Sequence, residues 1–165
     1  MSDVVTKATG QLRAAIEAAA KKAVAAGALP QGELAPFTIE VPADRSHGDF
    51  AANAAMVSAR TLRTAPRKIA EAIGERLELE GTYFDRYEIA GPGFLNFFLN
   101  PGYYADIITD ILEKGDEYGR SDYGKGERVV VEFVSANPTG PMHIGNARGG
   151  ALGAGIASVM DAAGY

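Results

Sequence analysis

The sequence contains no cysteine and no tryptophan, and only two of its 165 residues are histidine. Without cysteine the chain forms neither a disulfide nor a thiolate metal site, which suits a reducing compartment. No apolar run approaches the ~20 residues that a membrane-spanning helix needs. The opening residues MSDVVTKATG also lack the basic and then apolar pattern of a secretory signal. We therefore expect a cytoplasmic protein that has no membrane partner.

Basic residues are in the minority, because 16 lysines and arginines face 21 aspartates and glutamates, for a formal net charge of −5. The excess of acid lies within residues 81–127, which is typical of solvated helix faces. An acidic total argues against unspecific binding to nucleic acids, which depends on neutralising phosphates. It does not exclude a shaped RNA site.

Hydrophobic periodicity predicts the order α-β-α-α-β-β-α, then a polar joint, then β-turn-α. The nearly continuous apolar run RVVVEFVS favours a strand buried on both faces of a parallel sheet. We expect Asp49, Thr64 and Asn100 to cap the helices that follow them. The expected helices are 3–27, 50–62, 66–79, 100–119 and a last one reaching Gly164; the expected strands are 37–42, two around the Gly-Pro-Gly turn within 86–99, and 128–135.

The composition changes at the polar stretch SDYGKGE, residues 121–127. We therefore expect a domain over 1–120, a linker over 121–127 and the start of a second domain over 128–165. A single parallel strand with one helix is half of a crossover unit, so the second part is expected to be only the first piece of a domain. The predicted fold class is α/β, with an α+β first domain that packs helices on a small antiparallel sheet.

The stretch SANPTGPMHIGNARGG, residues 135–150, joins the expected buried strand to the last helix. A strand, a glycine-rich turn and a helix form an anion site, because the first helical N–H groups and the helix dipole face the ligand. The turn matches neither G-x-G-x-x-G nor the phosphate loop that ends in Gly-Lys-Ser/Thr. If the helix begins near Met142, His143 and Asn146 lie on one face of its first turn, where both can donate hydrogen bonds to phosphate oxygens. Such donors assist phosphoryl or nucleotidyl transfer.

The prolines and glycines of this stretch fit the same interpretation. Pro138 and Pro141 fix the turn in advance, and Gly145 would let a nucleotide lie against the backbone. Gly149 and Gly153, four residues apart, would let the helix press on a sheet. In the structural alternative, His143 only caps a helix and the glycines only pack.

The residues VEFVSANPTGPMHIGNARGG resemble the first signature of class I aminoacyl-tRNA synthetases, the HIGH motif, and in particular the version in the arginine enzyme. HGDFAANAAM (47–56), APRKIAEAI (65–73) and GPGFLNFFL (91–99) are similar to the N-terminal additional domain of arginyl-tRNA synthetase. The resemblance implies that 128–165 begins a Rossmann-like catalytic domain. The motif region comprises Ala136, Asn137, Pro138, Thr139, Gly140, Pro141, Met142, His143, Ile144, Gly145 and Asn146.

The resemblance also implies an activity. Arginine attacks the α-phosphate of ATP, with Mg²⁺ expected beside ATP, and the arginyl group passes to tRNA(Arg). His143 and Asn146 would be catalytic, with no metal or organic cofactor bound by the chain. The implied ATP contacts are Pro141, His143, Gly145, Asn146 and Gly149; the implied arginine contacts are Glu132, Ser135, Asn137 and His143. Phe94 and Asn96 would contact a base of the tRNA D-loop, although a core Phe and an edge Asn are the structural alternative. We expect the chain alone to be inactive, with the remainder of the synthetase as its partner.

Some residues depart from the family pattern or leave alternatives open. Asn146 replaces the second histidine of the motif, and Ala154 stands where the family usually has Asp. The cluster Arg60, Arg63, Arg67 and Lys68 is either a set of solvated helix ends or an RNA-backbone contact. Two other functions remain open from the residues: a different nucleotidyltransferase with a similar phosphate turn, and a stand-alone RNA-binding module.

Overall fold

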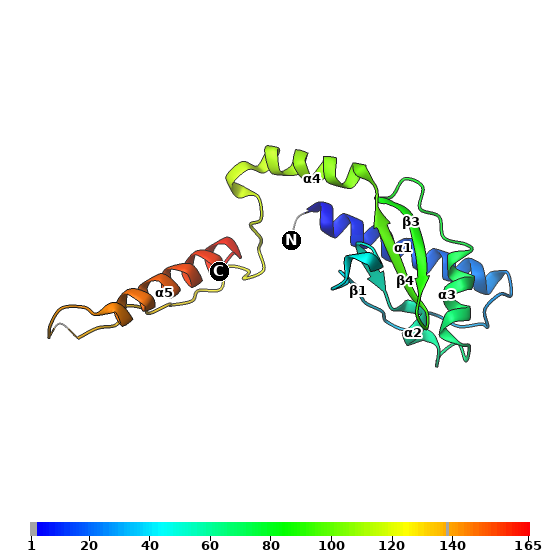
Figure 1. Ribbon diagram of the computed structural model, residues 1–165, viewed down its shortest axis with the longest axis horizontal. Helices are drawn as coiled ribbons and strands as arrows, with labels where there is room; N and C mark the ends of the chain where they lie inside the picture. The colour runs from blue at the N-terminus through cyan, green and yellow to red at the C-terminus, as the bar shows by residue number, and fades with distance from the viewer. Residues whose placement is uncertain (1–2, 138) are drawn as a thin grey trace. The chain divides into compact units, whose positions relative to one another are not determined.

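The computed structural model describes residues 3–137 and 139–165, and these form two compact units, 3–113 and 114–165 (Figure 1). The division thus lies before the expected domain boundary at residue 120. Each unit is described separately below.

The first unit packs helices on one face of a four-stranded antiparallel sheet with the strand order β1-β2-β4-β3. This arrangement confirms the predicted combination of helices and a small antiparallel sheet. The elements are α1 (Asp3–Ala25), β1 (Ile39–Glu40), the short 3-10 helix η1 (Arg45–His47), β2 (Phe50–Ala52), α2 (Ala54–Ser58), α3 (Pro66–Gly74), β3 (Phe84–Ala90), β4 (Phe94–Leu99) and α4 (Pro101–Lys114).

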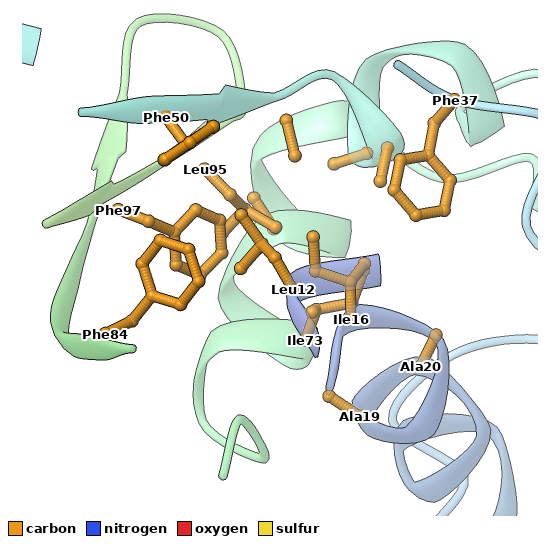
Figure 2. Packing of buried hydrophobic residues seen from close by; sticks show 14 of the residues in the cluster. Leu12, Ile16, Ala19, Ala20, Phe37, Phe50, Ile73, Phe84, Leu95 and Phe97 are labelled. Carbon is orange, nitrogen blue, oxygen red and sulfur yellow. The ribbon is translucent and has the colours of Figure 1, made fainter. Parts of the chain in front are cut away.

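The core lies between the sheet and helices α1 and α3. Leu95 and Phe97 of β4 are fully buried and share one cluster with Leu12 and Ile16 of α1 (Figure 2). Phe84 of β3 meets Phe97 edge to face, with ring centroids 5.9 Å apart. Each such side chain contributes roughly 1.5–3 kcal/mol by leaving water. Because side chains alternate along a strand, Phe94, Asn96 and Phe98 of β4 point to the opposite face of the sheet, whereas Leu99 packs against the core.

The helix expected over 50–62 is wrong at its start, because Phe50–Ala52 forms β2. This strand lies between two neighbours: Phe50 pairs with Phe97 of β4, and Ala52 pairs with Ile39 of β1. The helical preference of an alanine-rich segment is small compared with two strand pairings and a buried Phe. Only Ala54–Ser58 is helical, as α2.

Two of the three expected caps are also wrong. The carboxylate of Asp49 accepts the backbone N–H of Leu99 at 2.9 Å and so links β2 to β4 instead of capping a helix. The hydroxyl of Thr64 donates to the carbonyl of Leu62 at 2.9 Å, and α3 begins without a side-chain cap and ends at Gly74 instead of near residue 79. Asn100 is confirmed, since its side-chain oxygen accepts the N–H of Tyr103 at 3.3 Å.

The second unit contains η2 (Gly115–Glu117) and α5 (Ile144–Ala162). The strand expected over 128–135 is wrong: these residues have no regular secondary structure, all except Val131 are exposed, and Val134 has φ 56°, which no strand adopts. A parallel strand is stable only between neighbours, and the described residues of this unit supply none. Residues 121–127, expected to be a linker, are hydrogen-bonded to the residues that follow α5. The backbone N–H of Gly124 donates to the carbonyl of Ala163, and that of Gly126 donates to the carbonyl of Gly164, both at 2.8 Å.

Candidate functional site

The start of α5 carries two side chains that cap it reciprocally. His143 is the N-cap residue, and its Nδ1 accepts the backbone N–H of Gly145 at 3.1 Å. Asn146 reaches back, and its Oδ1 accepts the backbone N–H of His143 at 3.0 Å. This is a capping box, built from His and Asn in place of the usual Ser/Thr and Glu. The helix therefore begins at Ile144, and His143 precedes the first turn instead of lying within it near Met142.

The capping box determines which donors these side chains can offer to a ligand. Because Nδ1 of His143 accepts a hydrogen bond, a neutral ring carries its proton on Nε2. Because Oδ1 of Asn146 accepts, the two N–H bonds of its Nδ2 stay available. Both residues thus satisfy the structural alternative of helix capping and still present donors, so capping and phosphate binding are compatible here.

The glycines of α5 play different parts from those expected. A Cβ on Gly145 would lie 2.8 Å from Cε1 of His143, so this glycine makes room for the imidazole that caps the helix. Gly153 approaches the ring of Phe133 closely, and Gly150 approaches Val134. Gly149 faces open space within the described residues, so the expected contact of Gly149 with a sheet is wrong. The close approach comes from Gly153, against the side chain of Phe133 in a segment without regular secondary structure.

The other described residues of the motif region, and the four residues just before it, are exposed. The hydroxyl of Ser135 donates to the carboxylate of Glu132, which brings together two of the expected arginine contacts. Asn137, Pro141 and His143 are exposed as well, and Pro138 lies outside the described residues. Exposed side chains of this kind do not by themselves enclose a nucleotide, since pockets bury most of a ligand's surface.

A second candidate region is the face of the sheet that points away from the core. Phe94, Asn96 and Phe98 of β4 point to this free face, because the intervening Leu95 and Phe97 are in the core. Neither Phe94 nor Phe98 packs against the core cluster. The sequence expectation that Phe94 and Asn96 share one face of a strand fits this geometry.

Asn96 is unusual on this face, because it is only 4% exposed and carries a polar side chain. On the neighbouring strands it lies opposite Ala51 and Glu88. Its side chain forms no hydrogen bond with the described residues, yet those residues contain no fully buried, unpaired polar side-chain atom. The amide therefore touches the surface from an almost buried position, which leaves its donors and acceptor for a ligand.

The sequence analysis missed a further pair on the same face. The guanidinium of Arg86 lies over the ring of Phe98, 3.4 Å from its centroid, and is paired with the carboxylate of Glu88. The alternation in FLNFFL could have placed Phe98 beside Phe94 and Asn96. The partner on β3 could not be found without the strand register.

The described residues were compared with the requirements of a metal site and of a membrane-spanning helix. Across 3–137 and 139–165, no three His, Asp or Glu side chains gather as metal ligands. Nor does any helix within these ranges have the length and apolar character to cross a membrane.

Comparison with known proteins identifies relatives of the whole chain. The family model of the arginyl tRNA synthetase N terminal domain matches residues 10–99. The arginine–tRNA ligase of Acetivibrio thermocellus is 49% identical over 165 residues, which are 100% of this chain and 29% of that protein. The corresponding ligase of Caldanaerobacter subterraneus is 47% identical over the same shares. The chain thus spans 29% of the length of these curated relatives.

A solved structure supports the fold. The arginyl-tRNA synthetase of Plasmodium falciparum is similar with a TM-score of 0.55 and 18% sequence identity, covering 88% of this chain and 27% of that one. At this identity the similarity concerns the fold alone.

Proposed function

The chain belongs to the arginyl-tRNA synthetase family, and from this membership we propose that it is part of an enzyme that activates L-arginine with ATP and transfers it to tRNA(Arg). Because the chain spans 29% of the length of its relatives, we assign the complete reaction to a longer protein that works in the cytoplasm. Within that protein we assign two tasks to this chain: contact with the ATP phosphates by the second unit, and contact with the tRNA by the first.

The phosphate contact is assigned to the start of α5. Nε2 of His143 and Nδ2 of Asn146 would donate to the phosphate oxygens of ATP, whose negative charge rises as pyrophosphate leaves. Their other polar atoms are occupied by the capping box, so both side chains are oriented before the ligand arrives. The positive end of the α5 dipole would add to the attraction. Pro141, Gly145 and Gly149 would line the nucleotide side.

The arginine contact is assigned to residues just before this turn. The carboxylate of Glu132, already hydrogen-bonded to Ser135, has the charge that a guanidinium or ammonium group needs. Asn137 would add a hydrogen bond to the substrate. Since these side chains are exposed, we expect the 165-residue chain by itself to form no arginyl-adenylate.

The tRNA contact is assigned to the free face of the sheet, and one observation supports it: the nearly buried amide of Asn96, without a partner in the described residues, lies two residues from the ring of Phe94. RNA loops are read by stacking a splayed base on an aromatic ring and pairing its edge with polar groups. Phe94 would supply the ring and Asn96 the edge contact, with a base of the D-loop as the ligand.

Fluorescence anisotropy with a labelled transcript of a bacterial arginine tRNA tests this assignment. The 165-residue chain is expected to bind the transcript, and Asn96→Ala, Phe94→Ala or a changed D-loop is expected to weaken binding about tenfold. Tyr104→Ala is the matched control, because Tyr104 is an exposed aromatic residue of α4 and not of the sheet. Binding that is equal for wild type, Asn96→Ala and the changed D-loop would contradict the assignment.

A further inference from the structure

A basic segment lies beside the free face of the sheet. Residues 60–68, RTLRTAPRK, contain four basic residues and no acidic one, in a chain where acid predominates. All four basic side chains are exposed. Arg67 pairs with Glu71, whereas Arg60, Arg63 and Lys68 form no ion pair or hydrogen bond within the described part of the chain. Three unpaired cations therefore gather in a unit that has many carboxylates to offer.

These basic residues do not stabilise α3, the helix that they adjoin. Lys68 lies in the first turn of α3, and this first turn contains no acidic residue. A cation at a helix N-terminus opposes the helix dipole, so this position costs stability instead of adding to it. Arg63 has φ 47°, a left-handed conformation that favours glycine. Neither residue is the one that folding stability alone would select.

The segment is nevertheless held firmly in place. Leu62 is buried in the core, with 2% exposure, and the N–H of Thr64 donates to the carbonyl of Ala59 at 3.2 Å. The side chains on either side of Leu62 therefore start from a fixed backbone.

Direct contacts bring this segment to the tip of the β3–β4 hairpin. A Cβ on Gly93 would lie 2.8 Å from the backbone carbon of Pro66, so the turn before β4 touches the start of α3. The guanidinium of Arg67 donates to the carbonyl of Gly91 at 3.2 Å. Phe94 directly follows Gly93, so the start of α3 lies close to the end of β4 that carries the aromatic ring of Phe94.

We propose that Arg60, Arg63 and Lys68 bind the phosphates of the RNA strand whose base lies on Phe94 and Asn96. This inference rests on the proposed tRNA contact and extends it from the base to the backbone. A base on a protein surface has its own phosphate and the next one within a few ångströms, and basic side chains at that place supply most of the affinity. A local cluster also explains how a chain of net charge −5 attracts an RNA.

The test compares two charge-matched variants of the 165-residue chain. The first, Arg60→Gln with Arg63→Gln and Lys68→Gln, removes the proposed contacts. The control, Lys7→Gln with Lys21→Gln and Lys22→Gln, removes three exposed cations from α1, which covers the other face of the sheet. Anisotropy with the same arginine tRNA transcript is measured across a salt series, together with thermal unfolding.

The first variant is expected to bind about tenfold more weakly and to have a salt dependence lower by about 0.7 per lost phosphate contact, while the control stays near wild type. Arg63→Gly separates binding from folding, because it is expected to weaken binding without lowering the unfolding midpoint. If both triple variants bind alike while Asn96→Ala still weakens binding, the phosphate contact is refuted and the base contact stands. If the wild-type chain does not bind the transcript at low salt, both are refuted.

Discussion

His143 and Asn146 each accept one backbone N–H at the start of α5, and each keeps its own N–H donors for other partners. The relationship explains why Asn can stand where the family motif has a second His. The position needs an acceptor that reaches the N-cap N–H and a donor that points away, and an amide supplies both on one group.

Replacement of Asn146 tests its role as the acceptor that caps the start of α5. Asn146→Ala removes the acceptor and is expected to cost about 1 kcal/mol at the start of α5. Asn146→Asp keeps an acceptor and adds a favourable charge at the helix N-terminus, so the helix is expected to persist. Amide hydrogen exchange at His143 and Gly145 measures both effects. Equal protection in the alanine variant and the wild type would rule out the reciprocal cap.

The glycines of α5 provide a matched pair. Gly149→Ala is expected to stabilise the helix by about 0.8–1 kcal/mol, because the site is open and alanine favours helix. Gly153→Ala gains the same propensity, but its Cβ overlaps the ring of Phe133, so Phe133 must move away. Thermal unfolding gives the stability, and the ring proton shifts of Phe133 report the displacement. The packing is disproved if the two variants are equally stabilised and the ring shifts do not change.

A similar pair tests the contact between the hairpin tip and α3. Gly91 and Gly93 both have positive φ, 52° and 139°, but a Cβ meets nothing nearby at Gly91 within the described residues and the Pro66 backbone at Gly93. Gly91→Ala is expected to cost about 1–2 kcal/mol from its backbone conformation alone. Gly93→Ala should cost about 1–3 kcal/mol more, because α3 and the hairpin must separate. Urea denaturation measures both, and similar midpoints for the two variants would argue against the contact.

The sequence predicted the elements whose signal is local. The Gly-Pro-Gly turn gave the β3–β4 hairpin, and Asn100 gave the cap of α4, because both depend on residues within a few positions. Phe50–Ala52 was predicted as helix because its partners, Phe97 and Ile39, are distant in sequence. The energy of such strand pairing depends on residues outside the segment, so the sequence of the segment alone does not reveal it.

The features of the candidate sites also divide into those that local sequence predicts and those that depend on distant partners. The common face of Phe94 and Asn96 follows from the period of a strand, and so was predictable. The stacking of Arg86 on Phe98 needs the register of β3 against β4, and the contact of Gly93 with Pro66 needs the packing of a helix on a hairpin. For residues 128–135 the apolar pattern indicated a buried strand, but the described residues of that unit contain no neighbouring strands to bury it.

The stability that the turn at η1 contributes should depend on pH. The carboxylate of Asp44 accepts the backbone N–H of Ser46 at 2.8 Å, and this hydrogen bond lowers the pKa of Asp44. A folded-state pKa below the unfolded value of about 3.9 means that the group stabilises the fold above that pH, and that the contribution disappears as the pH falls through the folded pKa. The stability difference between wild type and Asp44→Asn is therefore expected to shrink below about pH 4. A constant difference from pH 6 to pH 2 in urea denaturation would show that the hydrogen bond does not stabilise the charged form.

Asn96 allows the sharpest separation of function from folding. In the free chain its amide is nearly buried and has no partner among the described residues, so removing it should not lower stability. Asn96→Val keeps a similar volume and favours strand, and is expected to raise the free energy of unfolding by about 1 kcal/mol. The same variant is expected to bind the arginine tRNA transcript about tenfold more weakly, because the edge of the stacked base loses its partner.

Stability and affinity should therefore change in opposite directions for Asn96→Val. Urea denaturation and anisotropy, measured on one preparation, give both values. A variant that is less stable and also binds less would show Asn96 to be a structural residue, and the loss of binding would then follow from a disturbed sheet. A variant that is more stable and binds equally would show that the amide does not contact the RNA. Only the combination of higher stability and weaker binding supports a side chain kept for its ligand.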